Sequence, residues 1–392
     1  MKPSVWAGSL LVAGTAIGGG MLALPVLTSQ GGFVPSLAIY LLCWLFMAGT
    51  GLLLLELTLA YGAGSNLITL AERTLGGYGK AATWVLYLYM FYCLTVAYMV
   101  GCGDILNHLI LNGSSQSLGM ILFTLIFAPM VWAGAKFIGP FNSYMMLVLI
   151  GLYALFVVIG APHIDFELLK RSDWKMSLIA LPIAFTSFAF QGIIPTLVSY
   201  LESDKKALRK AILIGSFLPL NIYVIWQALI LGIIPVDGEF GLKSALDNGD
   251  NAIKPLKHFI DNPFLVVIGS GFAFFALLTS FFGVTLGLKD FLADGLKIQK
   301  TKLGRLHLCL YVFIPPLLFA LIYPNVFLLA LDWAGGYGCA LLLGLLPILM
   351  AYKKRYVFKD LRFQELKGGK LILAFLLLFV IFELYIELVT DF

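Results

Sequence analysis

Residues 14–25, with the sequence GTAIGGGMLALP, constrain the fold of this chain more than any other segment. They lie in an apolar run, about 5–28, that is long enough to cross a bilayer, yet they include four glycines and Pro25. Each interior glycine costs a helix about 1 kcal/mol, and proline removes a backbone donor. Because hydrocarbon offers no water to a freed backbone group, an interrupted span survives only against protein or a wet cavity. The segment predicts either close helix packing through Gly14 and Gly18 or a binding site.

A second apolar run, about 178–200, is interrupted in the same way. Gln191, Gly192 and Pro195 stand near its middle. Two interrupted spans at corresponding positions of two halves are the strongest sequence indication of a secondary transporter's site. The pair therefore favours a binding site over simple packing.

The composition places the chain in a lipid bilayer. Of its 392 residues, 60% are hydrophobic and 12% are charged, and the mean hydropathy is +0.96. A soluble core does not need that ratio, so we predict an all-α polytopic membrane protein. The five cysteines have irregular spacing and indicate neither a disulfide framework nor a metal centre.

Eleven apolar runs can be traced, and basic residues set their orientation. The runs cover about 5–28, 33–60, 81–111, 118–135, 139–160, 176–200, 211–235, 263–289, 306–323, 325–351 and 369–389. With a cytoplasmic N-terminus, twenty of the 26 Lys and Arg residues fall on the cytoplasmic side, six fall outside and none lies inside a span. This positive-inside pattern predicts a cytoplasmic N-terminus and an exported C-terminus, and it explains the basic charge without nucleic acid.

The runs form two sets of five within a single transmembrane transporter domain, 1–392. Residues 1–160 and 175–351 each begin with an interrupted span, and an odd number of spans gives the two sets opposite topology. Residues 369–392 add an eleventh helix. The loop from about 235 to 262 contains either a short helix over the outer vestibule or plain solvated chain.

Four motifs, in order along the chain, resemble those of bacterial hydroxy and aromatic amino acid permeases. They are GTAIGGGMLALP at 14–25, LLLLEL at 52–57, FTSFAFQGIIP at 185–195 and TSFFGVTLGL at 279–288. The resemblance implies the fold of the leucine transporter (LeuT), a 5+5 inverted repeat with discontinuous helices 1 and 6, in the bacterial inner membrane. It also implies import of an aromatic amino acid, L-tyrosine first, driven by a proton gradient and without a cofactor.

Such a substrate has a carboxylate, an ammonium and an aromatic ring to be bound. N–H groups at the start of a half-helix suit the carboxylate, and carbonyls at the end of another suit the ammonium. The predicted substrate-binding residues are Thr15, Ala16, Gly18, Gly19, Gly20, Tyr92, Ser187, Phe188, Ala189, Phe190 and Gln191. In this hypothesis Phe188, Phe190 and Tyr92 line the ring pocket and Gln191 bonds a tyrosine hydroxyl. The alternative for each aromatic side chain is simple packing.

Carboxylates inside spans are the candidates for proton coupling, because buried ionisable groups in a membrane are costly and mark function. Glu56 is the first candidate, since no Lys or Arg is expected in a span to pair with it. Its alternative role is to bond free backbone N–H groups. Asp332 and Asp104 are weaker candidates, and Glu383 and Glu387 are expected at the membrane interface.

Sodium is the alternative coupling ion. The implied fold places Thr279 and Ser280 beside carbonyls of the first break, near Gly14 and Ile17, and hard oxygen ligands suit a small cation. Equally, such hydroxyls often bond the carbonyl one turn back.

Two other classes of function fit less well. A channel predicts a repeated filter motif, and a membrane enzyme predicts clustered His, Asp or Cys, whereas the four histidines are scattered. The sequence contains no Gly-x-x-x-x-Gly-Lys motif, so nothing indicates that ATP drives transport. We therefore predict a transporter and not an enzyme, with a broader aromatic or tryptophan symporter as the alternative and the oligomeric state left open.

Overall fold

The computed structural model describes residues 4–62, 65–111, 113–260, 262–299 and 301–390. All regular structure in these ranges is helical. Ten helical spans in them are long and apolar enough to cross a membrane, and a bent helix pair near the N-terminus brings the number to eleven. The predicted number of spans is confirmed. The two chain ends, for which we predicted a side of the membrane, lie outside the described residues.

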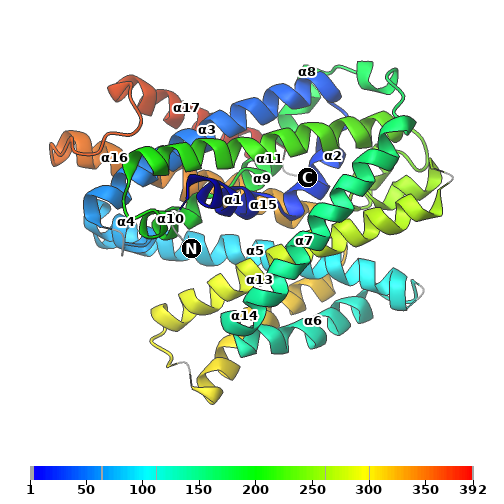
Figure 1. Ribbon diagram of the computed structural model, residues 1–392, viewed down its shortest axis with the longest axis horizontal. Helices are drawn as coiled ribbons and strands as arrows, with labels where there is room; N and C mark the ends of the chain where they lie inside the picture. Colours follow the sequence, from blue (N-terminus) through cyan, green and yellow to red (C-terminus); the bar gives the residue numbers. More distant parts are fainter. Residues whose placement is uncertain (1–3, 63–64, 112, 261, 300, 391–392) are drawn as a thin grey trace.

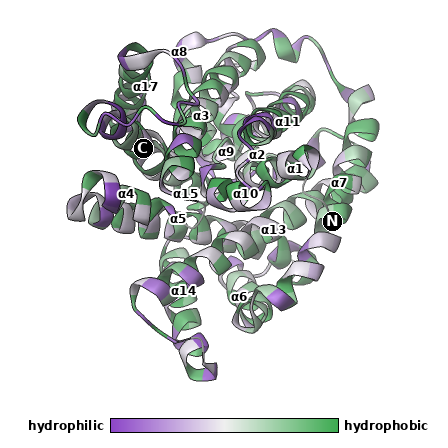
Figure 2. Cartoon of the chain, turned by 60° about the vertical axis from the view of Figure 1, so that its left-hand side comes forward, coloured by the Kyte–Doolittle hydropathy of each residue, from purple (hydrophilic) through white to green (hydrophobic). Residues whose placement is uncertain are grey.

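The spans follow the apolar runs closely. In chain order they are α1 Val5–Ala16 with α2 Gly19–Thr28, α3 Phe33–Tyr61, α5 Gly77–Ile110, α6 Gln116–Ala133, α7 Ala135–Gly160, the composite span Trp174–Tyr200, α11 Lys205–Ile233, α13 Pro263–Gly295, α14 Lys302–Ile322, the composite span Phe327–Val357, and α17 Gly369–Thr390. Figure 2 shows hydrophobic residues along these helices and hydrophilic residues toward the loops. Helices dominate because backbone groups in hydrocarbon must find partners within their own segment.

The two composite spans are irregular. The sixth consists of α8 Trp174–Ser177, η3 Leu178–Ala180, α9 Leu181–Ser187, η4 Gln191–Ile193 and α10 Ile194–Tyr200. The tenth consists of α15 Phe327–Trp333, the π-helix η6 Ala334–Leu345, α16 Leu346–Tyr352 and the π-helix η7 Lys353–Val357. The sequence analysis did not predict the π-helices, which are rare and frequently lie at functional sites.

The interrupted spans lie inside a shell of continuous ones. In Figure 1, α1, α9 and α15 lie in the middle, α3 and α11 pass above them, and α5 and α13 pass below. The contacts agree, since α1 packs on α11, α2 on α9, and α9 on η6. This arrangement keeps the open backbone of the breaks away from lipid, as the absence of water there requires.

The long loop between α11 and α13 is structured. It contains the short helices α12 Leu242–Asp247 and η5 Lys254–His258, and α12 packs on α2. The N–H of Ala252 donates to the carbonyl of Leu22 at 3.2 Å. Of the two readings left open, the short helix is therefore the right one. A further short helix, α4 Leu67–Leu75, lies between α3 and α5.

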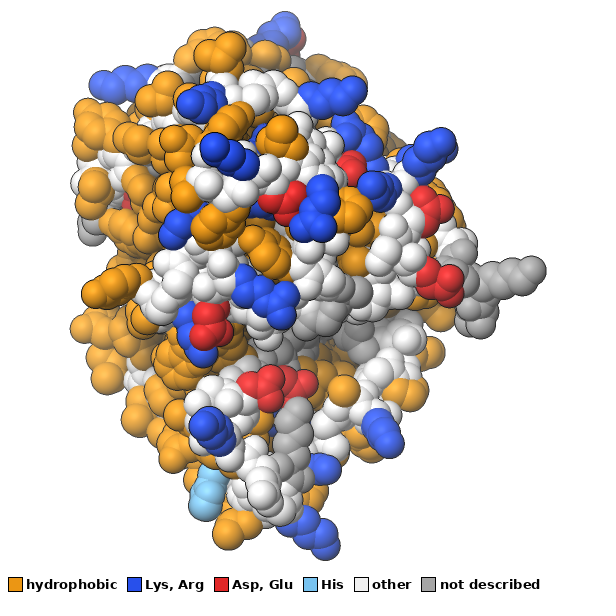
Figure 3. Space-filling model, turned by 90° about the vertical axis from the view of Figure 1, so that its left-hand side faces the viewer, with side chains coloured by type: hydrophobic (Ala, Val, Ile, Leu, Met, Phe, Trp, Pro, Cys, Tyr) orange, Lys and Arg blue, Asp and Glu red, His pale blue; other side chains and the backbone are white. Residues whose placement is uncertain are grey.

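Lys and Arg gather at one end of the molecule. Figure 3 shows the end at the left of Figure 1, where α4 and α10 lie, with Lys and Arg side chains spread across it. The prediction that no basic residue lies inside a span is wrong, because Lys289 in α13 and Lys354 and Arg355 in η7 are buried. Each lies in the last turns of its span, where a division of the chain by hydropathy assigned it to a loop.

Candidate substrate site

The first span breaks at Ile17 and Gly18. Ile17 is extended, with φ −74° and ψ 114°, and the axis turns by 56° between α1 and α2. The first N–H groups of α2 have no acceptor within their own helix and form the positive end of its dipole. Such an end suits an anion like a carboxylate. Gly19 and Gly20 are the first residues of α2.

The second break follows α9, and one side chain joins it to the first. α9 ends at Ser187, and regular structure resumes at Gln191. The hydroxyl oxygen of Tyr223, in α11, lies 2.8 Å from the carbonyl oxygens of both Ala16 and Ser187. This hydroxyl is therefore the hydrogen-bond donor for the carbonyls at the ends of α1 and α9. Both predicted breaks are confirmed, whereas Tyr223 was missed, because a lone hydroxyl in a span gave no signal.

The glycines of the first break pack tightly against other spans. A Cβ on Gly20 would lie 3.0 Å from the Cα of Ser187, and one on Gly18 would collide with the hydroxyl of Ser280. Around Gly14 there is room, since the nearest atom to such a Cβ lies 3.8 Å away. The tight packing therefore lies at the break itself and not along a Gly14–Gly18 stripe.

Gln191 is fully buried and ties the second break to α3. Its amide nitrogen donates to the carbonyl of Met47 at 3.2 Å and to the hydroxyl of Thr50 at 3.0 Å. Its amide oxygen accepts the N–H of Phe190 at 2.9 Å. These contacts hold the second break in place. Because an amide oxygen has two lone pairs and only one is used here, the Gln191 oxygen can accept one further hydrogen bond.

A cavity of about 500 Å³ lies at the two breaks. This volume is typical of small-molecule sites. On α5 the lining side chains include Tyr87, Phe91, Leu94 and Tyr98, which share one helical face. The predicted residues that border the cavity are Gly14, Thr15, Ala16, Gly18, Gly19, Gly20, Ala189, Phe190, Gln191, Thr279 and Ser280.

Tyr92 does not border this cavity, contrary to expectation. It lies on a different face of α5 from the side chains that line the cavity. Its hydroxyl donates to the carbonyl of Tyr311 in α14 at 2.8 Å. The sequence identified the right helix, but the choice of face needed the position of α14.

Ser187, Phe188 and Ile17 are at the breaks but do not line the cavity. Phe188 is 2% exposed and packs edge-on against Tyr40 and Tyr223, with ring centroids 6.2 and 5.2 Å away. The Ser187 hydroxyl donates to a carbonyl one turn back in α9. In this conformation the simple-packing alternative describes Phe188, while Phe190 faces the cavity.

The cavity extends toward the end of the molecule where α1 begins. Gly14 precedes the first break, and Gly287 lies in the last third of α13. On the other side of the breaks, the Tyr40 hydroxyl donates to Gln227, and the amide of Gln227 donates to Thr28, both at 2.6 Å. These bonds connect α3, α11 and α2 on that side.

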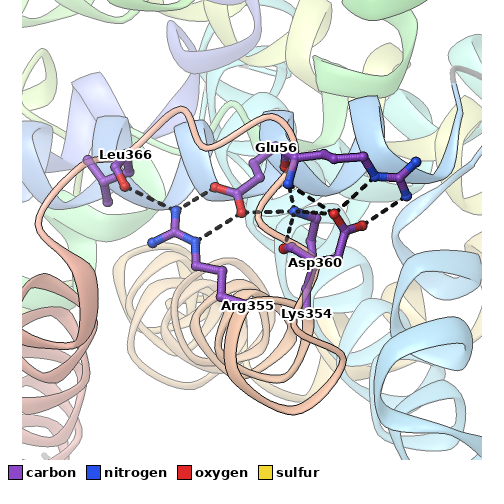
Figure 4. A network of polar contacts seen from close by, with 6 residues as sticks. Glu56, Lys354, Arg355, Asp360 and Leu366 are labelled. Atoms are coloured by element: carbon purple, nitrogen blue, oxygen red, sulfur yellow. Dashed lines mark hydrogen bonds and ion pairs between the residues drawn. The ribbon is translucent and has the colours of Figure 1, made fainter.

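Glu56 is held by two basic side chains (Figure 4). Arg355 donates to both carboxylate oxygens, one of them at 2.9 Å, and Lys354 donates at 3.3 Å. All three side chains are buried, and the two basic ones also donate to the carbonyls of Leu366 and Asp360. The premise that Glu56 lacks a cation is wrong. Its contacts describe a structural link between α3, η7 and the following loop.

Asp360 extends this network into the loop after η7. The guanidinium of Arg362 donates to both of its carboxylate oxygens at 3.0 Å, and these bonds lower the pKa of Asp360 to about 2. Lys354 lies 4.0 Å from the same carboxylate. The carboxylate of Asp360 therefore stays ionised at neutral pH.

The sodium candidates are partly engaged within the protein. The Thr279 hydroxyl donates to the carbonyl of Phe275, one turn back, at 2.9 Å. The Ser280 hydroxyl shares a hydrogen bond with Tyr98. Both still border the cavity.

Other acidic residues of the spans are buried inside the protein. Glu383 and Glu387 are 0% and 1% exposed, so both side chains pack against other helices, and their position relative to the membrane interface stays a prediction. Asp332 is 6% exposed and does not border the cavity at the breaks.

The sequence as a whole shows what kind of protein has this architecture. A model of the Tryptophan/tyrosine permease family matches residues 1–387. The chain belongs to this family. Similar permeases include the tryptophan-specific transport protein of Haemophilus influenzae, 31% identical over 99% of this chain and 96% of its own length. The tyrosine-specific transport system 1 of the same organism is 33% identical, covering 94% of this chain and 92% of its own length.

The low affinity tryptophan permease of Escherichia coli K12 is 32% identical, covering 96% of this chain and 94% of its own length. These permeases are transport proteins, so the prediction of an aromatic amino acid transporter family and not an enzyme is confirmed. The family resemblance found in the four motifs is confirmed as well.

Proposed function

We propose that this permease imports an aromatic amino acid, L-tyrosine first, together with a proton. The observation that carries the proposal is the cavity at two interrupted spans. It offers a helix N-terminus on one wall and aromatic rings on another, and the described lining contains no Lys or Arg. A zwitterion bound by helix ends needs no charged side chain.

In this proposal the substrate carboxylate meets the N–H groups at the start of α2, around Gly19 and Gly20. The ammonium lies toward the carbonyl end of α9, near Ala189. The ring packs among Phe190 and the cavity face of α5. A relative that transports tryptophan and one that transports tyrosine are similarly close to this chain, so tryptophan is the alternative substrate.

We propose transport by alternating access, which the difference between the two sides of the breaks supports. The hydrogen bonds around Gln227 connect α3, α11 and α2 on one side, and the cavity extends toward the other. We propose the LeuT-like 5+5 repeat, 1–160 and 175–351 with 369–392 added, because spans one and six are the interrupted ones and Tyr223 bridges them.

The end rich in Lys and Arg, toward which the cavity extends, is then cytoplasmic in a bacterial inner membrane. A reporter fused after residue 392 that works only outside the cytoplasm is expected to be active. Activity of a strictly cytoplasmic reporter at that position contradicts this orientation.

Proteoliposomes test the function directly. We expect labelled tyrosine to accumulate when the outside is more acidic than the lumen and the membrane potential is clamped. Sodium coupling, with Thr279 and Ser280 beside Gly14 as ligands, is the second candidate because these residues border one cavity. If tyrosine accumulates only when a sodium gradient is imposed, and to the same extent with or without a pH gradient, sodium is the driving ion. Absence of any uptake contradicts the proposed function.

Replacing Gln191 by leucine is expected to narrow the selectivity between tyrosine and phenylalanine. The remaining lone pair of its amide oxygen is the proposed acceptor for the tyrosine hydroxyl, and sites built on such a bond discriminate strongly against analogues that lack it. Competition of unlabelled tyrosine and phenylalanine for labelled substrate measures the ratio. Thr50→Val is the matched control, because it removes one amide contact of Gln191 and leaves its oxygen in place. An unchanged ratio in Gln191→Leu excludes this role.

A further inference from the structure

The last span carries two carboxyl groups on its buried face. Leu376, Val380, Glu383 and Glu387 recur at intervals of four, three and four residues, which places them on one side of α17. All four are at most 4% exposed. Leu376 and Val380 pack near Gly49 of α3 and Gly344 of η6. The two carboxyl groups therefore continue a packing stripe that is otherwise apolar.

Among the described residues, Glu383 has no hydrogen-bond partner for either of its carboxyl oxygens, and it is 0% exposed. The charged groups that act on it are the carboxyl groups of Glu387 and Asp332, and the thiols of Cys43 and Cys339 face it from α3 and η6. No basic side chain is among these neighbours.

Glu387 has its own set of neighbours. Its carboxyl group lies against Gly336 of the π-helix, where any Cβ would collide with it. Tyr89 of α5 interacts with it electrostatically, and Tyr337 of η6 interacts with Tyr89.

A carboxylate in such a place is expensive when ionised. Burying an unpaired charge costs many kcal/mol, and proteins normally avoid this cost by neutralising the group. For a carboxylic acid, neutralisation means that one oxygen binds a proton. A buried polar group without a partner also calls for a functional explanation. Glu383 is thus suited to bind and release a proton as water reaches it or is excluded.

The same cluster is mechanically linked to the second break. Thr186, the next-to-last residue of α9, donates to the carbonyl of Leu331 at 2.8 Å, next to Asp332. Gly335 packs so closely on α9 that a Cβ there would collide with the carbonyl of Pro182. Cys339 borders the substrate cavity and also faces Glu383. One layer of η6 therefore separates the cavity from the carboxyl cluster.

Asp332 connects the cluster to a second cavity. This cavity, about 360 Å³, is lined by Asp332, by Leu27 near the end of α2 and by residues of the loop after α12. It lies on the side of the breaks opposite to the substrate opening. The carboxyl group of Asp332 lies between the water of this cavity and Glu383, so it can relay a proton to Glu383.

We propose that Glu383, flanked by Glu387 and Asp332, is the proton-binding site that couples this permease to a pH gradient. The proposal rests on the proposed function, and it moves proton binding away from Glu56. In the cycle, one oxygen of the Glu383 carboxylate takes a proton from water of the Asp332 cavity. It returns that proton to water on the other side when the packing of η6 on α9 changes. On uptake an O–H bond of a hydronium ion breaks as the O–H bond of Glu383 forms, and on release the O–H bond of Glu383 breaks as a hydronium ion forms.

Glu383→Gln in proteoliposomes tests the coupling. With one proton per substrate and a clamped potential, each imposed pH unit drives about tenfold accumulation in the unaltered protein. Glu383→Gln mimics the permanently protonated form, so accumulation is expected to fall to a ratio of about one while tyrosine–tyrosine exchange continues. Tyr385→Phe is the matched control, because Tyr385 lies on the same helix but is 59% exposed. This variant is expected to accumulate tyrosine normally.

A second measurement does not depend on transport. Purified protein in detergent is expected to show an infrared band of a protonated carboxyl group that is lost in Glu383→Gln and kept in Tyr385→Phe. Tyrosine affinity is expected to vary with pH and to become independent of pH in Glu383→Gln, because linked sites must affect each other reciprocally. Undiminished pH-driven accumulation by Glu383→Gln, or an infrared band that persists in it, overturns the proposal. If the unaltered protein transports no aromatic amino acid, the proposed function fails, while the infrared band still decides whether Glu383 binds a proton.

Discussion

Gly20→Ala is expected to abolish uptake and to lower the yield of folded protein. The added carbon would lie 3.0 Å from the Cα of Ser187 and closer still to its hydroxyl, so the backbone of α9 must move. Overpacking of this kind typically costs about 1–3 kcal/mol. The displaced atoms belong to the second break, so the cavity at the two breaks is deformed as well. Initial uptake rates and the thermal unfolding midpoint in detergent measure the two effects.

Gly14→Ala is the matched control for this substitution. Gly14 lies on the same interrupted span and borders the same cavity, but its added Cβ meets nothing closer than 3.8 Å. We expect folding and uptake within about twofold of the unaltered protein, since removing a helical glycine is itself slightly favourable. If Gly20→Ala and Gly14→Ala behave alike, close contact between the two breaks is not what requires glycine at position 20.

Glu56→Gln is expected to destabilise the protein strongly, by about 3–5 kcal/mol, because it leaves the buried Arg355 without a counter-ion and leaves Lys354 only the Asp360 carboxylate, 4.0 Å away. Arg355 and Lys354 are at most 2% exposed, so water does not solvate the uncompensated charge. The apparent unfolding midpoint in detergent is the measurement. A matched control is Glu72→Gln, whose ion pair with Lys80 is about half exposed and is worth about 0–1 kcal/mol.

The double variant Glu56→Gln/Arg355→Gln sharpens the test. Removing both members of the closest pair takes away the unbalanced guanidinium, so the double variant is expected to be more stable than the sum of the two single losses predicts. Strict additivity would contradict the assignment of these residues as an energetically coupled pair. Equal stability of Glu56→Gln and Glu72→Gln would contradict the burial of the network.

The sequence predicted the spans well because their cause is local. A bilayer requires about 20 apolar residues in a row, and a glycine cluster or a proline inside such a row has few explanations. This reasoning placed both breaks within one or two residues. It also identified α5 as a wall of the site, although it chose Tyr92 on the wrong face.

What the sequence did not reveal depends on contacts between distant segments. Arg355 reads as a loop residue until α3 brings Glu56 to it, 299 positions earlier in the chain. The burial of Glu383 becomes visible only when α17 is packed against η6. The π-helices have no hydropathy signal, because one extra residue per turn changes neither composition nor length noticeably. Tyr223 was missed because its two acceptors, Ala16 and Ser187, lie in other spans.

The position of Tyr223 has a consequence for any movement at the centre of the protein. A hydroxyl has one hydrogen, and here two carbonyl oxygens stand at the same 2.8 Å from it. When the ends of α1 and α9 separate, the hydrogen can follow only one of them, and the other carbonyl must find a new donor. The hydrogen bonds of Tyr223 therefore depend on the distance between the two half-helices. An ammonium group has three hydrogens and could donate to the carbonyl that loses the tyrosine hydroxyl.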